Sequence, residues 1–181
     1  IGRVIGQDVA VVMNASGCGV MVKDYGHVLA DDASYADKAK RISALTRDLS
    51  ELLAEGLPAL QARLDPARVA QAGRLAYHPP CTLQHGQGLR DELGLGLQAL
   101  GFDVAMAAQE AHLCCGSAGT YSVLQPQTAT TLRDRKLGHL AALGPSVVVS
   151  ANIGCITHLQ SGTGTPVRHW VEVVDQALRA A

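Results

Sequence analysis

The sequence has few aromatic residues, no excess of charge of one sign and no long hydrophobic run. Aromatic residues make up 3% of the 181-residue chain, and 15 lysines and arginines stand against 16 aspartates and glutamates. The balanced charge gives no attraction for the phosphates of a nucleic acid. The hydrophobic runs are far shorter than the roughly 20 residues that a membrane helix needs. We therefore expect no nucleic-acid binding and no direct membrane span.

Several catalytic signatures are also absent from the sequence. It has no glycine-rich phosphate loop with a lysine, no Gly-x-Ser-x-Gly motif and no metalloprotease histidine pair. Hydrophobic residues make up 48% and charged residues 17%, which is typical of a folded domain with a buried core. The sequence starts at Ile1 without an initiator methionine or a signal segment, so we interpret it as a fragment or a processed piece.

Hydrophobic periodicity predicts short strands that alternate with longer amphipathic helices. The predicted strands cover residues 8–13, 74–77, 102–106 and 146–150. The predicted helices cover residues 34–55, 82–100, 127–143 and 171–180. Strands that alternate with helices need crossover connections, and these favour parallel pairing. The expected fold is therefore α/β, with a Rossmann-like parallel sheet and flanking helices.

A segment near the start of the chain resembles a segment near its end. Residues 11–21 and residues 148–158 align without a gap, and each contains an apolar strand, an asparagine and a Gly-Cys pair. The simplest explanation is a tandem repeat of one structural unit. We expect residues 1–60 to be the end of a truncated first unit and residues 61–181 to be a complete second unit.

The cysteines are the main candidates for metal ligands. Five cysteines, two of them adjacent, do not fit a simple set of paired disulfides. Cys81, Cys114, Cys115 and Cys155 each follow a predicted strand or begin a predicted helix. In an open parallel sheet these positions meet at the carboxyl edge, where ligands bind. The four thiols can therefore hold an iron–sulfur cluster, and zinc is the alternative metal.

Other residues are candidates for a second layer around such a centre. His78 and His112 precede the motif cysteines, and His85 lies one helical turn after the first of them. Their rings can hydrogen bond to a sulfur or to the backbone of a ligand loop. A turn histidine satisfied by its own backbone is the alternative for each. Gly116 and Gly119 allow the backbone to approach an inorganic cluster closely.

Two features have a structural interpretation beside a functional one. Cys18 is either a small buried hydrophobic residue or a further metal ligand, because it stands in the first copy of the repeated segment. Residues 133–136 form the charged run Arg-Asp-Arg-Lys. We expect this run to form a solvated helix face. A docking patch for a partner subunit is the alternative.

Three cysteine-containing stretches resemble a known protein family. Residues 78–86 (HPPCTLQHG), 110–121 (EAHLCCGSAGTY) and 150–160 (SANIGCITHLQ) are similar to the CCG cysteine-rich domain of heterodisulfide reductases and related iron–sulfur proteins. They are more similar still to the C-terminal part of glycolate oxidase iron–sulfur subunits. The resemblance implies a tandem pair of CCG domains, here with the first copy truncated. It also implies an iron–sulfur cluster, of the 4Fe-4S type, on the four cysteines from Cys81 to Cys155.

The sequence departs from the family pattern in two places. Where the pattern ends on a further cysteine, this sequence has His158, and the first copy has Met21 at the equivalent position. Imidazole can ligate iron and raises the potential of a cluster, so His158 is a further candidate ligand. A degenerate site without a cluster is the alternative. The ferredoxin-like motif that precedes the two CCG units in the family is absent here.

The resemblance implies an electron-transfer subunit of a flavin-dependent glycolate or other 2-hydroxy acid dehydrogenase complex. In such a complex the flavoprotein partner carries FAD and oxidises the substrate, and the iron–sulfur subunit passes electrons to a downstream acceptor without binding the substrate. The alternatives are a zinc-stabilised docking domain of the same complex and a thiol–disulfide oxidoreductase. Unpaired cysteines favour a reducing cytoplasm, with attachment to the inner membrane only through partners.

Overall fold

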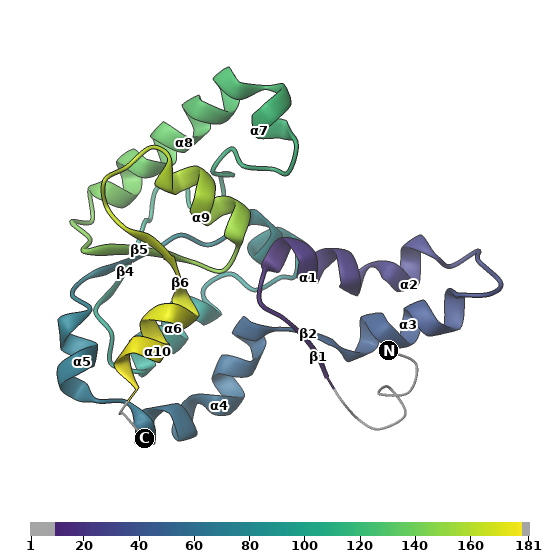
Figure 1. Ribbon diagram of the computed structural model, residues 1–181, viewed down its shortest axis with the longest axis horizontal. Coiled ribbons are helices and arrows are strands. Elements are labelled where there is room, and N and C mark those ends of the chain that lie inside the picture. The colour runs from purple at the N-terminus through teal and green to yellow at the C-terminus, as the bar shows by residue number, and fades with distance from the viewer. Residues whose placement is uncertain (1–9, 179–181) are drawn as a thin grey trace.

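Two parallel sheets with helices packed around them form the part of the chain that the computed structural model describes, residues 10–178 (Figure 1). The larger sheet has the strand order β4-β3-β5-β6, and the smaller sheet pairs β1 with β2. All of these pairs are parallel. The strands are β1 (Val11–Met13), β2 (Thr46–Asp48), β3 (Leu75–Tyr77), β4 (Val104–Met106), β5 (Val147–Ser150) and β6 (Val167–His169).

Helices connect the strands, which confirms the predicted α/β fold. The first group is α1 (Ser16–Lys23), α2 (Tyr25–Val28), α3 (Ala36–Leu45), α4 (Leu49–Arg63) and α5 (Pro66–Gln71). A wide π-helical turn, η1 (Thr82–Gly86), follows β3. The remaining helices are α6 (Glu92–Ala99), α7 (Tyr121–Leu124), α8 (Pro126–Ala141), α9 (Ile153–Gln160) and α10 (Trp170–Ala177).

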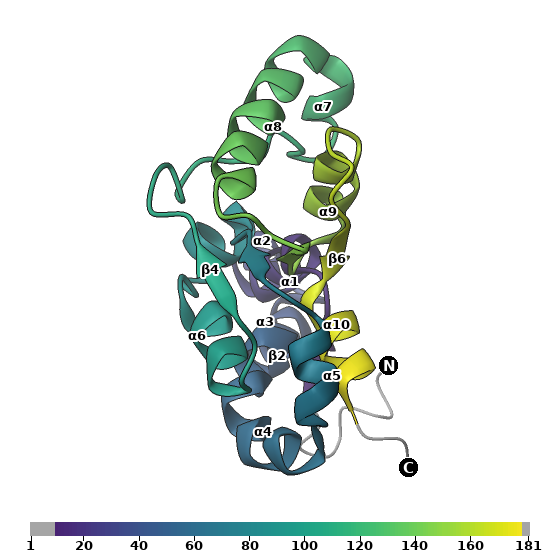
Figure 2. The same ribbon diagram turned by 90° about the vertical axis from the view of Figure 1, so that its left-hand side faces the viewer.

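The alternation of side chains along the central strands divides the core into two clusters. Leu75 and Tyr77 of β3 and Val149 of β5 belong to one cluster, whereas Ala76 and Val148 belong to the other. Helices α4, α5, α6 and α10 lie on the first side of the larger sheet, and α8 and α9 lie on the second (Figures 1 and 2). Because both faces are covered, these strands are hydrophobic throughout.

Most of the strands and two of the helices lie where the periodicity predicts them. Strands β3, β4 and β5 and helices α8 and α10 match their predicted ranges to within a few residues. Strand β1 matches the later part of the first predicted strand. Residues 8 and 9 of the first predicted strand and residues 179 and 180 of the last predicted helix lie outside the described residues.

The single helix predicted over residues 34–55 is wrong, because β2 separates α3 from α4. Asp48 ends this strand and caps α4: its carboxylate accepts a hydrogen bond from the backbone N of Ser50 at 2.9 Å. In return, the Glu51 carboxylate accepts one from the backbone N of Asp48 at 2.6 Å. This reciprocal cap, together with the pairing of β2 with β1, outweighs the helical spacing of the leucines.

The single helix predicted over residues 82–100 is also wrong. The chain makes the turn η1 and enters a regular helix again only at Glu92. Gly88 interrupts the helix with a φ of +74°, a left-handed conformation that glycine adopts without strain. Gln87 ties this break to the smaller sheet, since its Nε2 donates to Asp48 Oδ2 at 3.0 Å and to the carbonyl of Ser16 at 3.1 Å.

The two ends of the chain are built in the same order. Strand β1 is followed by α1, β2 and α4, as β5 is followed by α9, β6 and α10, with α2 and α3 inserted in the first series. Val11 pairs with Thr46 in the smaller sheet, as Val148 pairs with Val167 in the larger one. Both α4 and α10 begin with a capping box. Helix α4 runs across residue 60, the predicted division between the units, and packs against α6.

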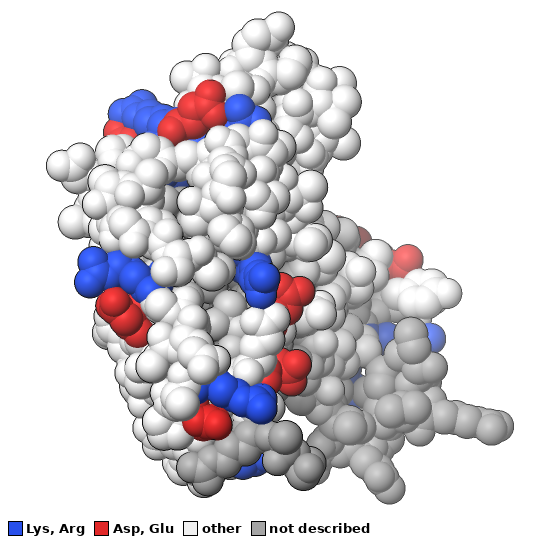
Figure 3. Space-filling view, turned by 60° about the vertical axis from the view of Figure 1, so that its left-hand side comes forward, with Lys and Arg blue, Asp and Glu red and all other residues white. Residues whose placement is uncertain are grey.

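The charged side chains form small mixed groups. On the face in Figure 3, blue and red atoms lie next to each other and no broad area has one sign. Arg74 pairs with Asp103 at 3.0 Å, and Arg68 pairs with Asp65 at 3.8 Å. Exposed pairs of this kind add little to stability. Within residues 10–178, no helix combines the length and the apolar character that crossing a bilayer demands.

Candidate metal centre

Three loops bring four cysteines to one edge of the larger sheet. Cys81 follows β3, Cys114 and Cys115 lie in the loop after β4, and Cys155 lies in the first turn of α9, just after β5. In the sheet β3 lies between β4 and β5. The chain therefore leaves neighbouring strands in different directions at this edge, which is where open parallel sheets bind ligands.

The four thiols form a connected group. Cys81 Sγ lies 3.9 Å from Cys114 Sγ, and the Cys115 thiol is close enough to those of Cys114 and Cys155 to shift their pKa values. Cys115 and Cys155 are buried, with 1% and 4% of their surface exposed, whereas Cys81 and Cys114 are half-buried. The group therefore reaches from the core under α8 and α9 to the protein surface.

Interactions between the thiols shift their pKa values in opposite directions. The neighbouring thiols of Cys115 and Cys81 lower the pKa of Cys114. The Cys115 thiol also lowers the pKa of Cys155, as does a hydrogen bond from Asn152. The same contacts with Cys114, together with burial, raise the pKa values of Cys81 and Cys115. In the metal-free site, negative charge is therefore favoured at Cys114 and Cys155 over Cys81 and Cys115.

The donor set fits an iron–sulfur centre. Four cysteine sulfurs are the ligands that such clusters take, and the adjacent pair can ligate two irons of one cluster. Among residues 10–178, no group of three or more histidine, cysteine, aspartate or glutamate side chains is arranged to hold a single metal ion. Zinc bound by the same thiols stays the alternative metal.

A family model decides how this arrangement is classified. Residues 75–160 match the CCG model, described as a cysteine-rich domain. This segment is a CCG cysteine-rich domain. It begins at β3 and ends at the last residue of α9, so it contains all four cysteines of the thiol group. The resemblance to CCG domains that the three sequence stretches predict is confirmed.

Relatives resemble the chain well beyond the CCG domain. It is 48% identical over 169 residues to the glycolate oxidase iron-sulfur subunit of Escherichia coli (strain K12), which covers 93% of this chain and 40% of that protein. It is 28% identical over 171 residues to lactate utilization protein A of Geobacillus kaustophilus (strain HTA426), covering 91% and 69%. It is 27% identical to the uncharacterized protein YkgE of Escherichia coli (strain K12), covering 92% and 70%. The chain thus spans less than half the length of the first of these relatives.

His78 lies between the central strand and the thiols of the CCG domain, with only 1% of its surface exposed. Its Nδ1 is 3.0 Å from Ser150 Oγ, and this hydroxyl donates its proton to the carbonyl of His78 at 3.0 Å. The network therefore assigns the ring proton to Nδ1. Nε2 remains a buried lone pair with no partner among the described protein atoms. Such an atom is available to a ligand of the site.

We expect His78 to make the stability of the metal-free protein depend on pH. Burial, helped by the charge of Lys136, lowers its pKa from 6.5 to about 3. As the pH falls through 6.5, the unfolded chain therefore takes up a proton that the folded protein refuses, and stability is lost. This group alone should lower the free energy of unfolding by about 2 kcal/mol between about pH 7.5 and about pH 5. Urea unfolding at both pH values measures the loss.

The His78→Gln variant is the control for this measurement because it lacks the titrating ring. Its free energy of unfolding should vary less with pH than that of the original chain. Equal pH dependence in the two proteins would contradict the assignment of a buried, neutral His78.

The loop after Cys115 uses left-handed backbone. Gly116 has a φ of +92° and Gly119 a φ of +60°, with Ala118 at +35° between them. A Cβ on Gly116 would lie 2.3 Å from the carbonyl O of Ala129 in α8, whereas a Cβ on Gly119 would meet nothing within 4 Å. Gly116 is therefore needed for close packing against α8, and its backbone N donates to Cys114 Sγ at 3.3 Å. Gly119 is needed only because its backbone is left-handed, which glycine adopts without strain.

The remaining candidate residues have backbone partners or exposed positions. His85 Nε2 donates to the carbonyl of His112 at 3.1 Å, so this ring holds the backbone of the loop before the cysteine pair. His158 Nε2 donates to the carbonyl of Ala129 at 3.2 Å, and its role as a metal ligand stays a prediction. Cys18 is exposed on α1.

Two side chains near the thiols are not among the site residues that the sequence predicts. Asn152 Nδ2 donates to Cys155 Sγ at 3.4 Å, and its Oδ1 accepts from the backbone N of Gly17 at 3.2 Å. Gln84 Nε2 donates to the carbonyls of Pro79 and Ala111, at 2.9 Å and 3.1 Å. Each residue lies three positions from a motif cysteine, and this helical spacing is the signal that identifies it.

The prediction that residues 133–136 form a solvated helix face is wrong for Lys136. Asp134 and Arg135 are exposed, and Arg135 forms an ion pair with Glu110. Lys136 instead points into the protein, with only 3% of its surface exposed. Helix α8 buries this side chain together with Ala129 and Leu140, because the three positions share one face of the helix.

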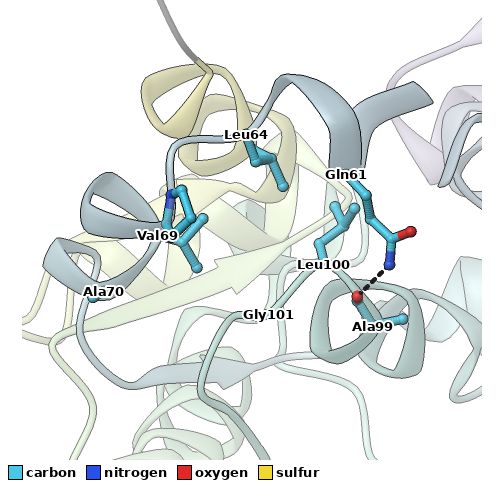
Figure 4. A pocket seen from close by; sticks show the side chains of 8 residues that line it. Gln61, Leu64, Val69, Ala70, Ala99, Leu100 and Gly101 are labelled. Carbon is cyan, nitrogen blue, oxygen red and sulfur yellow. Dashed lines mark hydrogen bonds between the residues drawn. The ribbon is translucent and has the colours of Figure 1, made fainter. Parts of the chain in front are cut away.

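On the other side of the larger sheet, the described residues form a hollow that is lined by neither thiols nor charged side chains. It lies between α4, α5 and the end of α6 (Figure 4). Its lining is largely apolar, with Leu64, Val69 and Leu100, and Gln61 Nε2 donates to the carbonyl of Ala99 at 2.8 Å. None of the described residues that line the hollow has an ionisable side chain. This hollow is therefore no candidate for the acid–base or metal chemistry that the thiols allow.

Proposed function

We propose that this chain holds an iron–sulfur centre and transfers electrons as a subunit of an oxidoreductase complex. The observation that carries the proposal is the group of four thiols, from three loops, at the carboxyl edge of the sheet. A relative with 48% identity is named glycolate oxidase iron-sulfur subunit, which supports the same assignment.

The proposed ligands are Cys81, Cys114, Cys115 and Cys155, with a cluster of the 4Fe-4S type. When bound, such a centre accepts and donates single electrons. The chain's own residues position it and limit its contact with water. Cys115 and Cys155 lie in the core, and Cys81 and Cys114 are half-buried, so a redox partner can approach the centre from their side. His158 is a further candidate ligand on α9.

The proposed partner is a flavoprotein subunit that carries FAD and oxidises a 2-hydroxy acid such as glycolate. The names of the relatives, which mention glycolate oxidase and lactate utilization, support this class of substrate. In this proposal the present chain binds no substrate and passes the electrons on. Its free thiols favour a reducing cytoplasm.

We further propose that residues 1–60 belong to a truncated first CCG unit and residues 61–181 to a complete second one. The shared order of strands and helices supports this division, as do the parallel pairing and the capping box in each half.

Metal analysis of protein purified without oxygen tests the function. We expect iron and acid-labile sulfide in matching amounts, and a low-temperature EPR signal that changes between the oxidised and reduced forms. Zinc without sulfide would contradict the proposal and leave a structural docking domain. Protein with neither metal nor sulfide, even after reconstitution with iron and sulfide, would also contradict it.

Thiol–disulfide exchange is the second candidate function, and the pair Cys81 and Cys114 favours it. Hydrogen bonds lower the pKa of Cys114, and the Cys81 sulfur lies 3.9 Å away. The Cys114 thiolate would attack a substrate disulfide and release one substrate thiolate. Cys81 would then lose its proton, attack the mixed disulfide and release the second thiolate, leaving a Cys81–Cys114 disulfide. Failure of the metal-free protein to reduce oxidised glutathione would contradict this candidate.

A further inference from the structure

A lysine is buried beside the thiol group. Lys136 lies on the inner face of α8, and its Nζ donates to the carbonyl of Glu110 and, at 3.5 Å, to that of Ala111. Both carbonyls belong to the loop that leads from β4 to Cys114 and Cys115. Lys136 therefore fixes the backbone immediately before the adjacent cysteine pair.

The burial of this ammonium group needs compensation. Removing an ammonium ion from water costs several kcal/mol unless hydrogen bonds and opposite charge replace the water. The two carbonyls supply hydrogen bonds. Burial lowers the pKa of Lys136, and its interactions with Cys115, Glu110 and Cys114 oppose that effect. The Glu110 carboxylate also binds Arg135 and His139. The other groups whose charge acts on this lysine are the thiols of Cys115, Cys114 and Cys81.

We propose that Lys136 is a positioning residue that holds the loop of residues 110–115 by its carbonyls and balances the negative charge of the cysteine-ligated centre. The inference rests on the proposed function. Reduction adds one electron to a centre that already carries negative charge, and a nearby buried cation stabilises the added charge. Loss of the cation should therefore lower the midpoint potential.

Gln84 offers a matched neutral comparison. Its Nε2 donates to the same carbonyl of Ala111, and it ties that loop to the carbonyl of Pro79 in the loop before Cys81. It is buried, with 7% of its surface exposed. Gln84→Leu removes a tether without removing a charge, whereas Lys136→Met removes both a tether and a charge. Comparing the two variants separates positioning from electrostatics.

The first measurement follows amide hydrogen exchange by mass spectrometry in the metal-free protein. We expect exchange in residues 107–117 to be about tenfold faster in Lys136→Met than in the original chain. Lys136→Arg, which keeps a cationic donor, should recover most of the protection. Unchanged exchange in Lys136→Met would overturn the positioning role, and this result does not depend on whether the chain holds a cluster.

The second measurement is a redox titration followed by EPR in protein loaded with iron and sulfide. We expect a lower midpoint potential in Lys136→Met than in both the original chain and Gln84→Leu. Equal potentials in the two variants would overturn the electrostatic role. If Lys136→Met does not fold, Lys136→Gln replaces it in the redox titration, because it keeps an N–H donor and loses the charge, and Lys136→Ala replaces it in the exchange measurement, because it removes the donor. Absence of iron and sulfide from the original chain would instead contradict the proposed function.

Discussion

Cys114→Ser and Cys115→Ser should each reduce bound iron and acid-labile sulfide to about a tenth of the original content or less. Both side chains lie at the centre of the thiol group: Cys114 contacts Cys81, and Cys115 contacts Cys114 and Cys155. A serine hydroxyl is a poor iron ligand because it stays protonated at neutral pH. Iron and sulfide analysis of protein purified without oxygen, with absorbance in the visible range, measures the loss.

Cys18→Ser is the matched control for these two variants. Cys18 is exposed on α1 and stands in the first copy of the repeated segment. Its replacement also removes one thiol, so it corrects for nonspecific binding of iron to cysteines. We expect this variant to keep its iron and sulfide. Unchanged cluster content in both Cys114→Ser and Cys115→Ser would remove the adjacent pair from the ligand set.

Gly116→Ala should lower the free energy of unfolding by about 3 kcal/mol or more, because two costs combine. The left-handed backbone at a φ of +92° is strained for alanine, and the new Cβ would lie 2.3 Å from the carbonyl O of Ala129. The backbone of α8 cannot yield without breaking helical hydrogen bonds. The loop after Cys115 must therefore shift. Denaturant unfolding of the metal-free protein measures the loss.

Gly119→Ala separates the two costs. Gly119 also has left-handed backbone, at a φ of +60°, but a Cβ there would meet nothing within 4 Å. We expect a loss of about 1 kcal/mol from backbone strain alone. The same loss in both variants would show that contact with α8 does not constrain Gly116. Because Gly116 also donates its backbone N–H to Cys114, its alanine variant should hold less iron than the Gly119 variant.

The centre combines buried and half-buried sulfurs for a physical reason. Cys115 and Cys155 belong to the hydrophobic cluster under α8 and α9, with Leu140 and Leu159. A low-dielectric surrounding makes negative charge costly, so polar groups must surround the sulfurs. Asn152 supplies such a contact to Cys155. These hydrogen bonds are also the means by which a protein adjusts the potential of a cluster.

The expected site depends on strand positions that hydrophobic patterns predict well. Short apolar runs with turn residues at their ends identify β3, β4 and β5, and each precedes a motif cysteine. Parallel pairing then brings the cysteines to one edge without any knowledge of side-chain packing. Helix continuity was harder to predict. The leucine spacing that suggests one helix over residues 34–55 does not reveal that β1 offers a partner to Thr46–Asp48.

The sequence by itself determined the α/β fold and the positions of the cysteines after the strands. Both follow from local patterns: apolar periodicity and turn residues. Only the tertiary structure decided that Lys136 is buried, that His78 keeps a buried lone pair, and that Gln84 joins two cysteine loops. A polar side chain next to charged neighbours is predicted to be solvated when only the sequence is known. Whether it is buried depends on which carbonyls and charges distant segments place within its reach.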